Sequence, residues 1–303
     1  MDRRKFISLV GAGIAAAPFI KTLPKSSAHY SNPSVNYDLV AVRGGDAVSM
    51  FDAGIKSLGG IGKFVKKGQK VVLKPNIGWD VVPERAANTN PALVARIIEH
   101  CLNAGAKEVV VFDNTCDNWM KCYKNSGIEK AVKESGGKLA PGNSESYYQS
   151  ISVPNGKRLN SAKVHELILD SDVFINVPIL KTHGSAKLTI GMKNLMGIVW
   201  DRSYWHRNNL HQCITDFASF RKPDLNIVDA YNVMKSNGPR GVDEEDVMNL
   251  KAQIISADIV AADAASAKLL NFEPEDIQYI KSAREMGLGR TDLQNLNINR
   301  IKI

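Results

Sequence analysis

Short apolar runs alternate with amphipathic stretches along most of the chain. The apolar runs are rich in Val and Ile and carry no polar alternation, as in "QKVVLKP", "KEVVVFD" and "DVFINVP". Between them, "AVSMFDAGIKSL" and "NPALVARIIEHCLNAG" have apolar residues at helical spacing, and the second has Pro at its start and Gly at its end. Apolar strands of this kind are typical of a parallel sheet covered on both faces. The pattern predicts an α/β fold: a doubly wound, mostly parallel sheet with helices on both faces.

The second half of the chain continues the alternation. It predicts helices in "KVHELILDS", "LHQCITDFASF", "DIVAADAASAKLL" and "PEDIQYIKSAREMG", and strands in "LNIVDA", "AQIISA" and "LNINRIKI". The segment "YYQSISVP" is expected to be extended and to pair at an edge. Residues 77–90 and 232–249 are the longest irregular stretches, and each follows a strand. Loops of that length in a compact domain are usually functional.

The first 28 residues have the order of an export signal: a charged start, an apolar stretch over residues 7–20, and a polar tail. The pair Arg3-Arg4 resembles a twin-arginine signal. The apolar stretch is shorter than the roughly 20 residues of a membrane-spanning helix, although an uncleaved anchor is the alternative. We expect an export signal at 1–28, a single α/β domain at 29–303, a periplasmic or other extracytoplasmic location, and transient membrane contact during export.

The net charge of the 303-residue chain is +8, but this charge does not by itself indicate a binding partner. Residues 1–28 hold five Lys/Arg and one Asp, so +4 remains for the rest of the chain. The remaining basic residues are spread along the sequence, whereas a nucleic-acid partner requires a clustered basic face. The sequence therefore predicts no nucleic-acid binding.

The four cysteines form no C-x-x-C pair and no ferredoxin-type run, so their spacing does not predict an iron-sulfur cluster. Cys116 and Cys122 are close in sequence and flank a predicted loop, which allows a disulfide after export. Cys101 lies in an apolar helical pattern and is expected to be an inert core thiol.

The segment "WHRNNLHQC" contains His206, His211 and Cys213, which are metal-ligand types. On one continuous helix His206 and Cys213 share a face, but His211 points roughly 140 degrees away, at about 100 degrees per residue. The alternative roles are a pocket wall for His211 and a loop donor for His206.

Polar residues stand where the predicted strands end. They are Lys74 and Asn76 in "KPN", Asp113 in "FDN", Lys181 and His183 in "KTH", and Asp229 in "VDAYN". Ligands of open parallel sheets bind at the carboxyl ends of the strands. Lysines from neighbouring strands would form a positive pocket that stabilises a carboxylate or phosphate. Partial burial would also lower a lysine pKa and permit a Schiff base or proton transfer. Taken singly, each lysine has the alternative of simple solvation.

The segment "GMKNLMG", with Lys193 and Asn194, resembles a helix start whose N–H groups would add to an anion site. Asp113, Asp229 and Asp263 are candidates for a general acid or base, or for binding a hard cation. For Asp229 the alternative is a helix cap or an ion pair with a lysine. Asp263 lies in an apolar run and needs a partner, because an unpaired buried carboxylate is costly.

Several phrases resemble the family called domain of unknown function 362. They are "VVLKPNIG", "NTNPALVARIIEHCLNAGAKEVVVFDN", "SDVFINVPILKTH", "LTIGMKNLMGIV", "PDLNIVDA", "NGPRG" and "ISADIVAADAASAKLL", which run through most of residues 38–300. The resemblance implies no settled activity. Many members of the family are similar to iron-sulfur proteins through an added ferredoxin-like segment, which this chain lacks. The family's KPN, KTH and GMKN phrases map onto Lys74–Asn76, Lys181–His183 and Gly191–Asn194.

The sequence thus predicts an exported α/β protein that binds, and acts on, an anionic small molecule in a lysine-lined pocket. The expected catalytic residues are Lys181, His183, Asp229 and Asp263, and the expected ligand-binding residues are Lys74, Asn76, Asp113, Lys193 and Asn194. The alternative is a non-catalytic module that docks on a redox or envelope partner protein, or one that holds a metal or iron-sulfur cluster through Cys116, Cys122 and His183. The sequence does not specify a cofactor, a substrate or a reaction.

Overall fold

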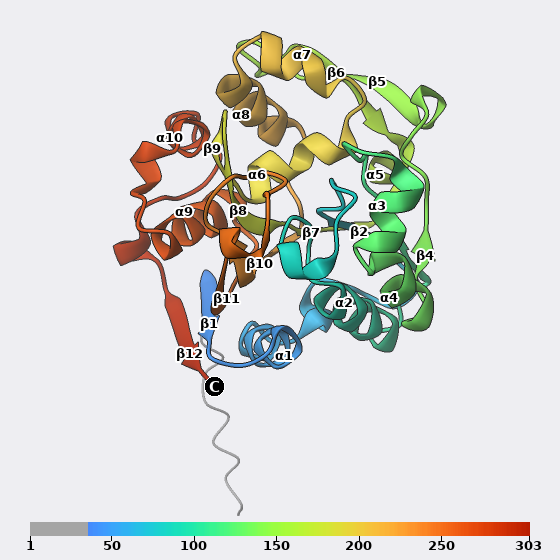
Figure 1. Ribbon diagram of the computed structural model, residues 1–303, viewed down its shortest axis with the longest axis vertical. Helices are drawn as coiled ribbons and strands as arrows, with labels where there is room; N and C mark the ends of the chain where they lie inside the picture. Colours follow the sequence, from blue (N-terminus) through green and yellow to red (C-terminus); the bar gives the residue numbers. More distant parts are fainter. Residues whose placement is uncertain (1–35) are drawn as a thin grey trace, which may run out of the picture. The chain divides into compact units, whose positions relative to one another are not determined.

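The computed structural model describes residues 36–303, and the predicted export signal at 1–28 lies outside the described residues. The main sheet has the strand order β12-β1-β11-β10-β7-β2-β3-β4, and β8 and β9 join it beside β10 (Figure 1). Its strands are β1 (Leu39–Arg43), β2 (Lys70–Pro75), β3 (Glu108–Val111), β4 (Lys138–Leu139), β7 (Val173–Val177), β8 (Ile179–His183), β9 (Lys187–Thr189), β10 (Leu225–Met234), β11 (Val247–Ser256) and β12 (Ile298–Lys302). The α/β class expected from the apolar runs is confirmed.

Helices cover both faces of this sheet. They are α1 (Ala47–Ser57), α2 (Pro91–Asn103), α3 (Trp119–Asn125), α4 (Ile128–Glu134), α5 (Glu166–Asp170), α6 (Gly191–Asn194), α7 (Arg202–Arg207), α8 (Leu210–Phe220), α9 (Ile259–Leu269) and α10 (Gln278–Glu285). In Figure 1, α1, α2 and α4 lie side by side, and α8, α9 and α10 form a second group.

Successive side chains of a strand point to opposite faces of the sheet, so the apolar strands supply two cores at once. In β7, Phe174 packs in the core that contains Phe217 of α8 and residues of α9. Its neighbour Ile175 packs in the other core, with Phe51 of α1 and Ile97 of α2. This double burial explains why the strand sequences show no polar alternation.

Local capping signals mark the ends of α2 as the sequence predicts. The side chain of Asn90 accepts a hydrogen bond from the amide of Ala92 at 2.9 Å, and Pro91 occupies the first turn. The chain leaves the helix through Gly105, whose φ of +90° is unfavourable for other residues. The helix therefore starts directly after the loop that follows β2.

The chain reverses direction across the sheet at β2. This strand pairs in parallel with β3 on one side and with β7 on the other. The chain runs outward from β2 to β4, then returns to β7 and continues through β10. In doubly wound sheets the crevice at such a switch point, at the carboxyl ends of the strands, is the usual ligand site. Lys74 and Pro75 end β2 at this point.

Two expectations about the elements need correction, and one strand departs from the parallel majority. Residues 163–171 do not form a helix throughout, because β6 (Ser161–His165) pairs with β5 (Tyr148–Ser152) in a separate two-stranded sheet and only α5 is helical. Within 232–249, β10 continues to Met234 and β11 begins at Val247, so the irregular part is shorter. Strand β11 runs antiparallel to both β10 and β1, since residues 235–246 connect it to β10 without a crossover helix.

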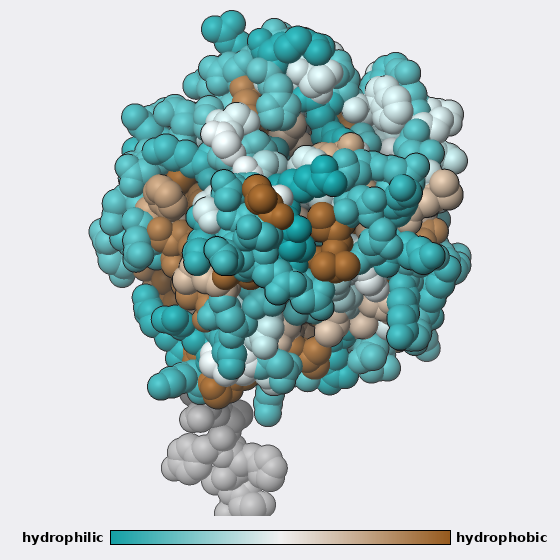
Figure 2. Space-filling model, viewed as in Figure 1, coloured by the Kyte–Doolittle hydropathy of each residue, from teal (hydrophilic) through white to brown (hydrophobic). Residues whose placement is uncertain are grey.

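Hydrophilic residues cover most of the face drawn in Figure 2. The large apolar side chains that are exposed are Val82, Met120, Leu169, Tyr204, Val242 and Ile303. Scattered single apolar residues of this kind are normal on a folded surface. Among the described helices, none has the length and apolarity required to cross a membrane.

A matched pair of methionines tests the two-faced burial. Met50 of α1 is 0% exposed and packs in the core beneath α1 and α2, whereas Met120 of α3 is 58% exposed. We expect Met50→Ala to lower the free energy of unfolding by about 2–5 kcal/mol, because it removes buried methylenes and leaves a cavity. Met120→Ala should change it by less than about 0.5 kcal/mol. Urea unfolding measures both, and equal losses would contradict the proposed packing of α1.

Candidate functional site

A buried ion pair lies at the switch point. The Nζ atom of Lys74 is 2.9 Å from Oδ1 of Asp113, and the two residues are 0% and 3% exposed. Nζ also donates to the carbonyl oxygen of Pro75 at 2.7 Å and to Oδ1 of Asn194 at 3.0 Å. Burial by itself lowers the pKa of Lys74, and the Asp113 carboxylate opposes this shift. Loss of the Lys74 proton would leave the buried carboxylate without its counter-ion, and this cost opposes deprotonation of Lys74.

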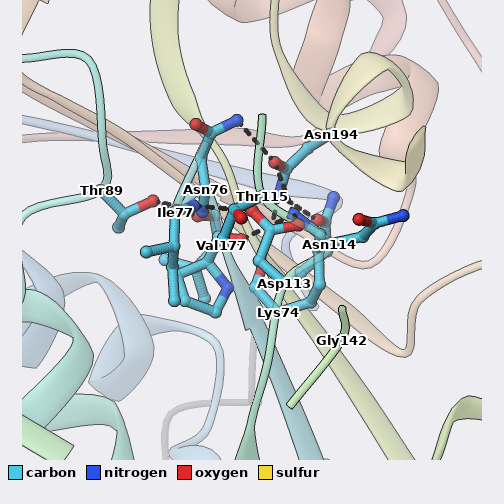
Figure 3. Close-up of polar contacts among 12 residues, drawn as sticks. Lys74, Asn76, Ile77, Thr89, Asp113, Asn114, Thr115, Gly142, Val177 and Asn194 are labelled. Atoms are coloured by element: carbon cyan, nitrogen blue, oxygen red, sulfur yellow. Dashed lines mark hydrogen bonds and ion pairs between the residues drawn. The ribbon is translucent and has the colours of Figure 1, made fainter. Parts of the chain in front are cut away.

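Asn194 of α6 connects this ion pair to the rest of the site, as Figure 3 shows. Its Oδ1 accepts from Lys74 Nζ and, at 2.9 Å, from Nδ2 of Asn76. Its own Nδ2 donates to Oδ1 of Asn176 in β7 at 2.9 Å, and Asn176 in turn donates to Asn226 of β10 at 3.1 Å. These side-chain amides form a ladder from the site into the centre of the sheet, and each orients the next.

Lys181 of β8 reaches the same place from a second strand. It is 1% exposed, and its Nζ donates to the carbonyl oxygen of Ala87 and to Oδ1 of Asn76 at 3.2 Å. No carboxylate of residues 36–303 lies within ion-pair distance of it. Burial lowers the pKa of Lys181 to about 7. The loop over residues 77–90, expected to be functional, thus contributes a backbone carbonyl to the site.

Lys193 of α6 is half-buried and lies beside the same hollow. Within the described part of the chain its ammonium makes no hydrogen bond and no ion pair. Burial lowers the pKa of Lys193 to about 8. Arg202 of α7 also faces the hollow, where its guanidinium donates to the carbonyl oxygens of Asn114 at 2.7 Å and Thr115 at 2.6 Å.

Together these groups line a cavity of about 60 Å³. Four basic residues and one acidic residue face it, namely Lys74, Lys181, Lys193, Arg202 and Asp113. Drug-sized ligands occupy pockets of roughly 300–1,000 Å³, so this cavity is smaller than a site that encloses a whole molecule of that size. Its positive excess and low-dielectric walls favour an anionic group.

His183 borders the cavity, and the hydrogen bonds of its ring make Nε2 a donor. Its Nδ1 accepts from the amides of Ser185 and Ala186, both at 3.2 Å, so the proton of the neutral ring lies on Nε2. Burial, followed by the charges of Lys193 and Lys181, lowers the pKa of His183 to about 3. The expected role of His183 in moving protons therefore finds little support in this geometry.

Thr189 of β9 adds a hydroxyl group to the cavity wall. It is 3% exposed, and its Oγ1 has no hydrogen-bond partner in the described part of the chain. Thr189 is the cross-strand partner of Lys181 in the β8–β9 hairpin, so the two side chains project from the same face. A buried hydroxyl without a partner is costly, so this one is available to hydrogen-bond to a group that enters the cavity.

Asp229 and Asp263 do not line this cavity, contrary to the expectation that they move protons there. The Asp229 carboxylate accepts from the amides of Asn90 at 2.8 Å and Tyr231 at 3.1 Å. Asp263 of α9 accepts from Gly191 at 2.7 Å and Met192 at 3.0 Å. The first amides of α6, expected to bind a ligand anion, are therefore occupied by Asp263. Burial raises the pKa of Asp229 to about 6 and that of Asp263 to about 8.

The expected metal ligands also remain apart. Cys116 is exposed at the cavity, 3.4 Å from Nη1 of Arg202, whereas Cys122 is buried and points to the carbonyl oxygen of Gly78 at 3.7 Å. Both thiols are free, so the disulfide that their spacing allows is not formed in this structure. Within residues 36–303 no three His, Cys, Asp or Glu side chains are grouped to hold a metal ion. The separation of Cys116 from Cys122 by the start of α3 explains both corrections.

The other segment with metal-ligand types does not form a site either. It is divided between α7 and α8, and the chain turns at Asn209, whose φ is +70°. His206 stacks on His183 with ring centroids 6.4 Å apart, and His211 stacks on Tyr279 at the same distance. Cys213 is buried and directed at the carbonyl oxygen of Asn208.

A larger groove of about 800 Å³ lies between the β5–β6 sheet and α7. Its charged residues are Glu145, Arg158, Lys163 and Asp201, two of each sign, and Lys163 forms an ion pair with Glu145. It therefore has no charge excess comparable with that of the lysine-lined cavity.

Four contributors to the site escaped the sequence analysis: Asn176, Asn226, Thr189 and Arg202. The two asparagines had a detectable signal, because each is the polar residue inside an apolar strand, in "VFINV" and "LNIV". Such a residue needs a buried partner. Thr189 and Arg202 had no such signal in the sequence, because they reach the cavity only through the folding back of the β8–β9 hairpin and of α7.

Comparison with known proteins decides the family. The model of the family described as domain of unknown function (DUF362) matches residues 71–268. The chain belongs to this family. All the cavity residues named above fall within the matched range of the DUF362 protein.

Two individual proteins are similar to this DUF362 chain. A thylakoid-associated protein of Synechocystis sp. is 28% identical over 256 residues, which cover 78% of this chain and 74% of that protein. The lactate racemase apoprotein from Thermoanaerobacterium thermosaccharolyticum is 12% identical, with a TM-score of 0.46 over 73% of this chain. The matched part spans 55% of the racemase chain.

Gly197 tests the importance of the buried ion pair. A Cβ atom at this position would lie 1.8 Å from Oδ1 of Asp113 and 2.6 Å from Nζ of Lys74. We expect Gly197→Ala to separate the pair and to lower the free energy of unfolding by about 3–5 kcal/mol, as for other disrupted buried pairs. Gly184→Ala is the control, because a Cβ there meets no atom within 4 Å. Equal unfolding curves for the two variants would show that the pair is dispensable.

Proposed function

We propose that this protein binds a small anionic molecule by its head group, in the cavity lined by Lys74, Lys181, Lys193 and Arg202, and acts on it. The observation that carries the proposal is the excess of positive charge in a confined space. Asp113 neutralises Lys74, but the described part of the chain offers no carboxylate to Lys181 or Lys193. A buried charge without a partner is costly, and a bound carboxylate or phosphate group would supply the partner.

The depth of the lysines favours a small molecule over a docking partner. Lys74 and Lys181 are at most 1% exposed, so an acidic protein surface would not reach them. Surfaces that attract acidic proteins use exposed basic residues, which act through long-range steering. The docking alternative therefore draws less support from the geometry than the ligand-binding function does.

Lys193 provides the first test. Because its ammonium makes no contact that holds the described fold together, Lys193→Gln should leave the melting temperature unchanged. It should weaken the binding of glycolate or inorganic phosphate by about ten-fold to a hundred-fold, since one charged hydrogen bond contributes about 1.5–3 kcal/mol. Isothermal titration calorimetry measures the affinity. Lys187→Gln, at an exposed lysine of the β8–β9 hairpin, is the matched control and should bind as the parent does.

The same titrations should depend on pH in a defined direction. Anion binding favours the protonated lysines, so affinity should fall as the pH rises through the pKa values of Lys181 and Lys193, about 7 and about 8. Glycolate carries a constant charge over this range, so the change belongs to the protein. An affinity independent of pH, or equal in the Lys193 and Lys187 variants, would refute the proposal.

We also propose that the chain is exported by the twin-arginine route, so that the site operates outside the cytoplasm. The support is the order of the first 28 residues, with Arg3-Arg4 before a short apolar stretch. A ligand-binding protein with several buried polar contacts is suited to a pathway that carries folded proteins.

Replacing the arginine pair tests the export proposal. Arg3→Lys together with Arg4→Lys keeps the charge but should retain the protein in the cytoplasm, as measured by fractionation of a bacterial host that has the pathway. Lys5→Arg is the control and should be exported normally. Mass spectrometry of the exported protein distinguishes a cleaved signal from an uncleaved anchor. Unchanged export of the double variant would exclude this route.

A further inference from the structure

We propose that Lys181 is a nucleophilic amine that forms an imine with the carbonyl group of a small oxo acid, whose carboxylate is held beside Lys193. This inference rests on the anion-binding function proposed above and names the substrate class of the same cavity. It follows from the number and kind of acceptors around each lysine.

Lys74 has as many acceptors around it as an ammonium group has N–H donors. Its Nζ meets three acceptors, the carbonyl oxygen of Pro75, Oδ1 of Asn194 and the carboxylate of Asp113. An ammonium group has three N–H donors and no lone pair, so these acceptors use its full capacity. Lys74 is therefore unsuited to attack a carbonyl carbon.

Lys181 has the surroundings of a neutral amine. Its Nζ meets two acceptors, the carbonyl oxygen of Ala87 and Oδ1 of Asn76, and both are uncharged. A neutral amine has two N–H donors, which these acceptors satisfy, and one lone pair. In the ammonium form a third N–H would find no acceptor among residues 36–303. Burial disfavours the charged form further and lowers the pKa of Lys181 to about 7, so much of it is neutral near neutral pH.

The cavity places two further groups where such a reaction needs them. Thr189 lies across the hairpin from Lys181, and its buried Oγ1 lacks a partner in the described part of the chain. Its hydroxyl is available to donate to the oxygen of the carbonyl group under attack. Lys193 faces the same cavity, and its ammonium has no hydrogen-bond or ion-pair partner in the described part of the chain, so it is available to a carboxylate.

The chemical step is balanced without any further reagent. The lone pair of Lys181 Nζ attacks the carbonyl carbon, and the new C–N bond gives a carbinolamine. Protons from the amine and from solvent convert the carbonyl oxygen to water, which leaves as the C–O bond breaks. The product is a protonated imine on Lys181 and one water molecule.

The size of the cavity, about 60 Å³, limits the substrate to a compact group in which the carbonyl adjoins the carboxylate. Glyoxylate is the smallest compound of this class and is a suitable probe. Glycolate has the same carboxylate but lacks the carbonyl, so it tests anion binding separately from imine formation. Acetaldehyde has the carbonyl but lacks the carboxylate.

The experiment traps the imine by reduction. The purified protein is incubated with glyoxylate and sodium borohydride, and peptide mass spectrometry locates carboxymethylated lysines. We expect glyoxylate to modify Lys181, and we expect excess glycolate to suppress this modification. Acetaldehyde should ethylate Lys181 much more weakly, because it lacks the carboxylate. The rate of trapping should rise as the pH increases through about 7, the pKa of Lys181. Lys187→Arg should react as the parent does, whereas Lys181→Met should lose the modification.

The outcomes separate the two proposals. If glycolate binds but glyoxylate modifies only exposed lysines such as Lys187, the imine is wrong and anion binding stands. Modification of Lys193 in place of Lys181 would overturn the argument from acceptors. If glycolate does not bind either, both proposals fail. The peptide map of the parent protein decides these points even if Lys181→Met does not fold.

Discussion

The buried ion pair between Lys74 and Asp113 is the interaction on which the site depends. Lys74 ends β2, Asp113 follows β3, and Asn194 comes from α6, so three segments distant in sequence meet at one ammonium group. Such a pair adds little net stability compared with an apolar contact, but removing one partner is strongly destabilising. The pair therefore favours the one arrangement of these segments in which Lys74 and Asp113 are in contact. The close approach of Gly197, where any side chain would overlap Asp113, belongs to the same constraint.

The three lysines of the cavity show how a common residue type acquires different chemistry. Lys74 has a carboxylate and two carbonyl oxygens, Lys181 has two neutral oxygens, and Lys193 has no partner in the described residues. Burial lowers the pKa values of all three lysines, and only Lys74 has a carboxylate at ion-pair distance to oppose this shift. The number of acceptors therefore assigns a structural role to the first lysine and leaves the other two available to a ligand.

The sequence predicted much of the fold because its main signal is local. Apolar runs without polar alternation identified β2, β3 and β7, and caps identified α2. It also predicted that Lys74, Asp113 and Lys181 stand at strand ends, and the structure brings these residues together, although Lys181 lies within β8 and not at its end. Residues 163–171 were misassigned because the same apolar spacing fits a strand followed by one helical turn, and pairing with β5 decides between them.

The buried carboxylates show why the rest of the site was beyond sequence reasoning. Asp229 and Asp263 are of a residue type that serves as a catalytic acid, yet both carboxylates accept hydrogen bonds from backbone amides. Whether a carboxylate faces a ligand or an amide depends on contacts between segments more than 70 residues apart. Within residues 36–303 the cysteines and histidines form no metal site for a similar reason, since closeness along the chain does not bring their side chains together.

The amide ladder gives the site order without adding charge. Asn76, Asn194, Asn176 and Asn226 are linked by hydrogen bonds of 2.9–3.1 Å and lead from the cavity to the middle of the sheet. If carboxylates occupied these positions, they would cancel the positive excess of the cavity and remove the need for an anion. Amides fix the geometry through both donors and acceptors while the positive excess remains. A rigid, hydrogen-bonded frame around charges that the protein leaves uncompensated is what a site preorganised for an anion requires, because the ligand then meets its partners without reorganising them.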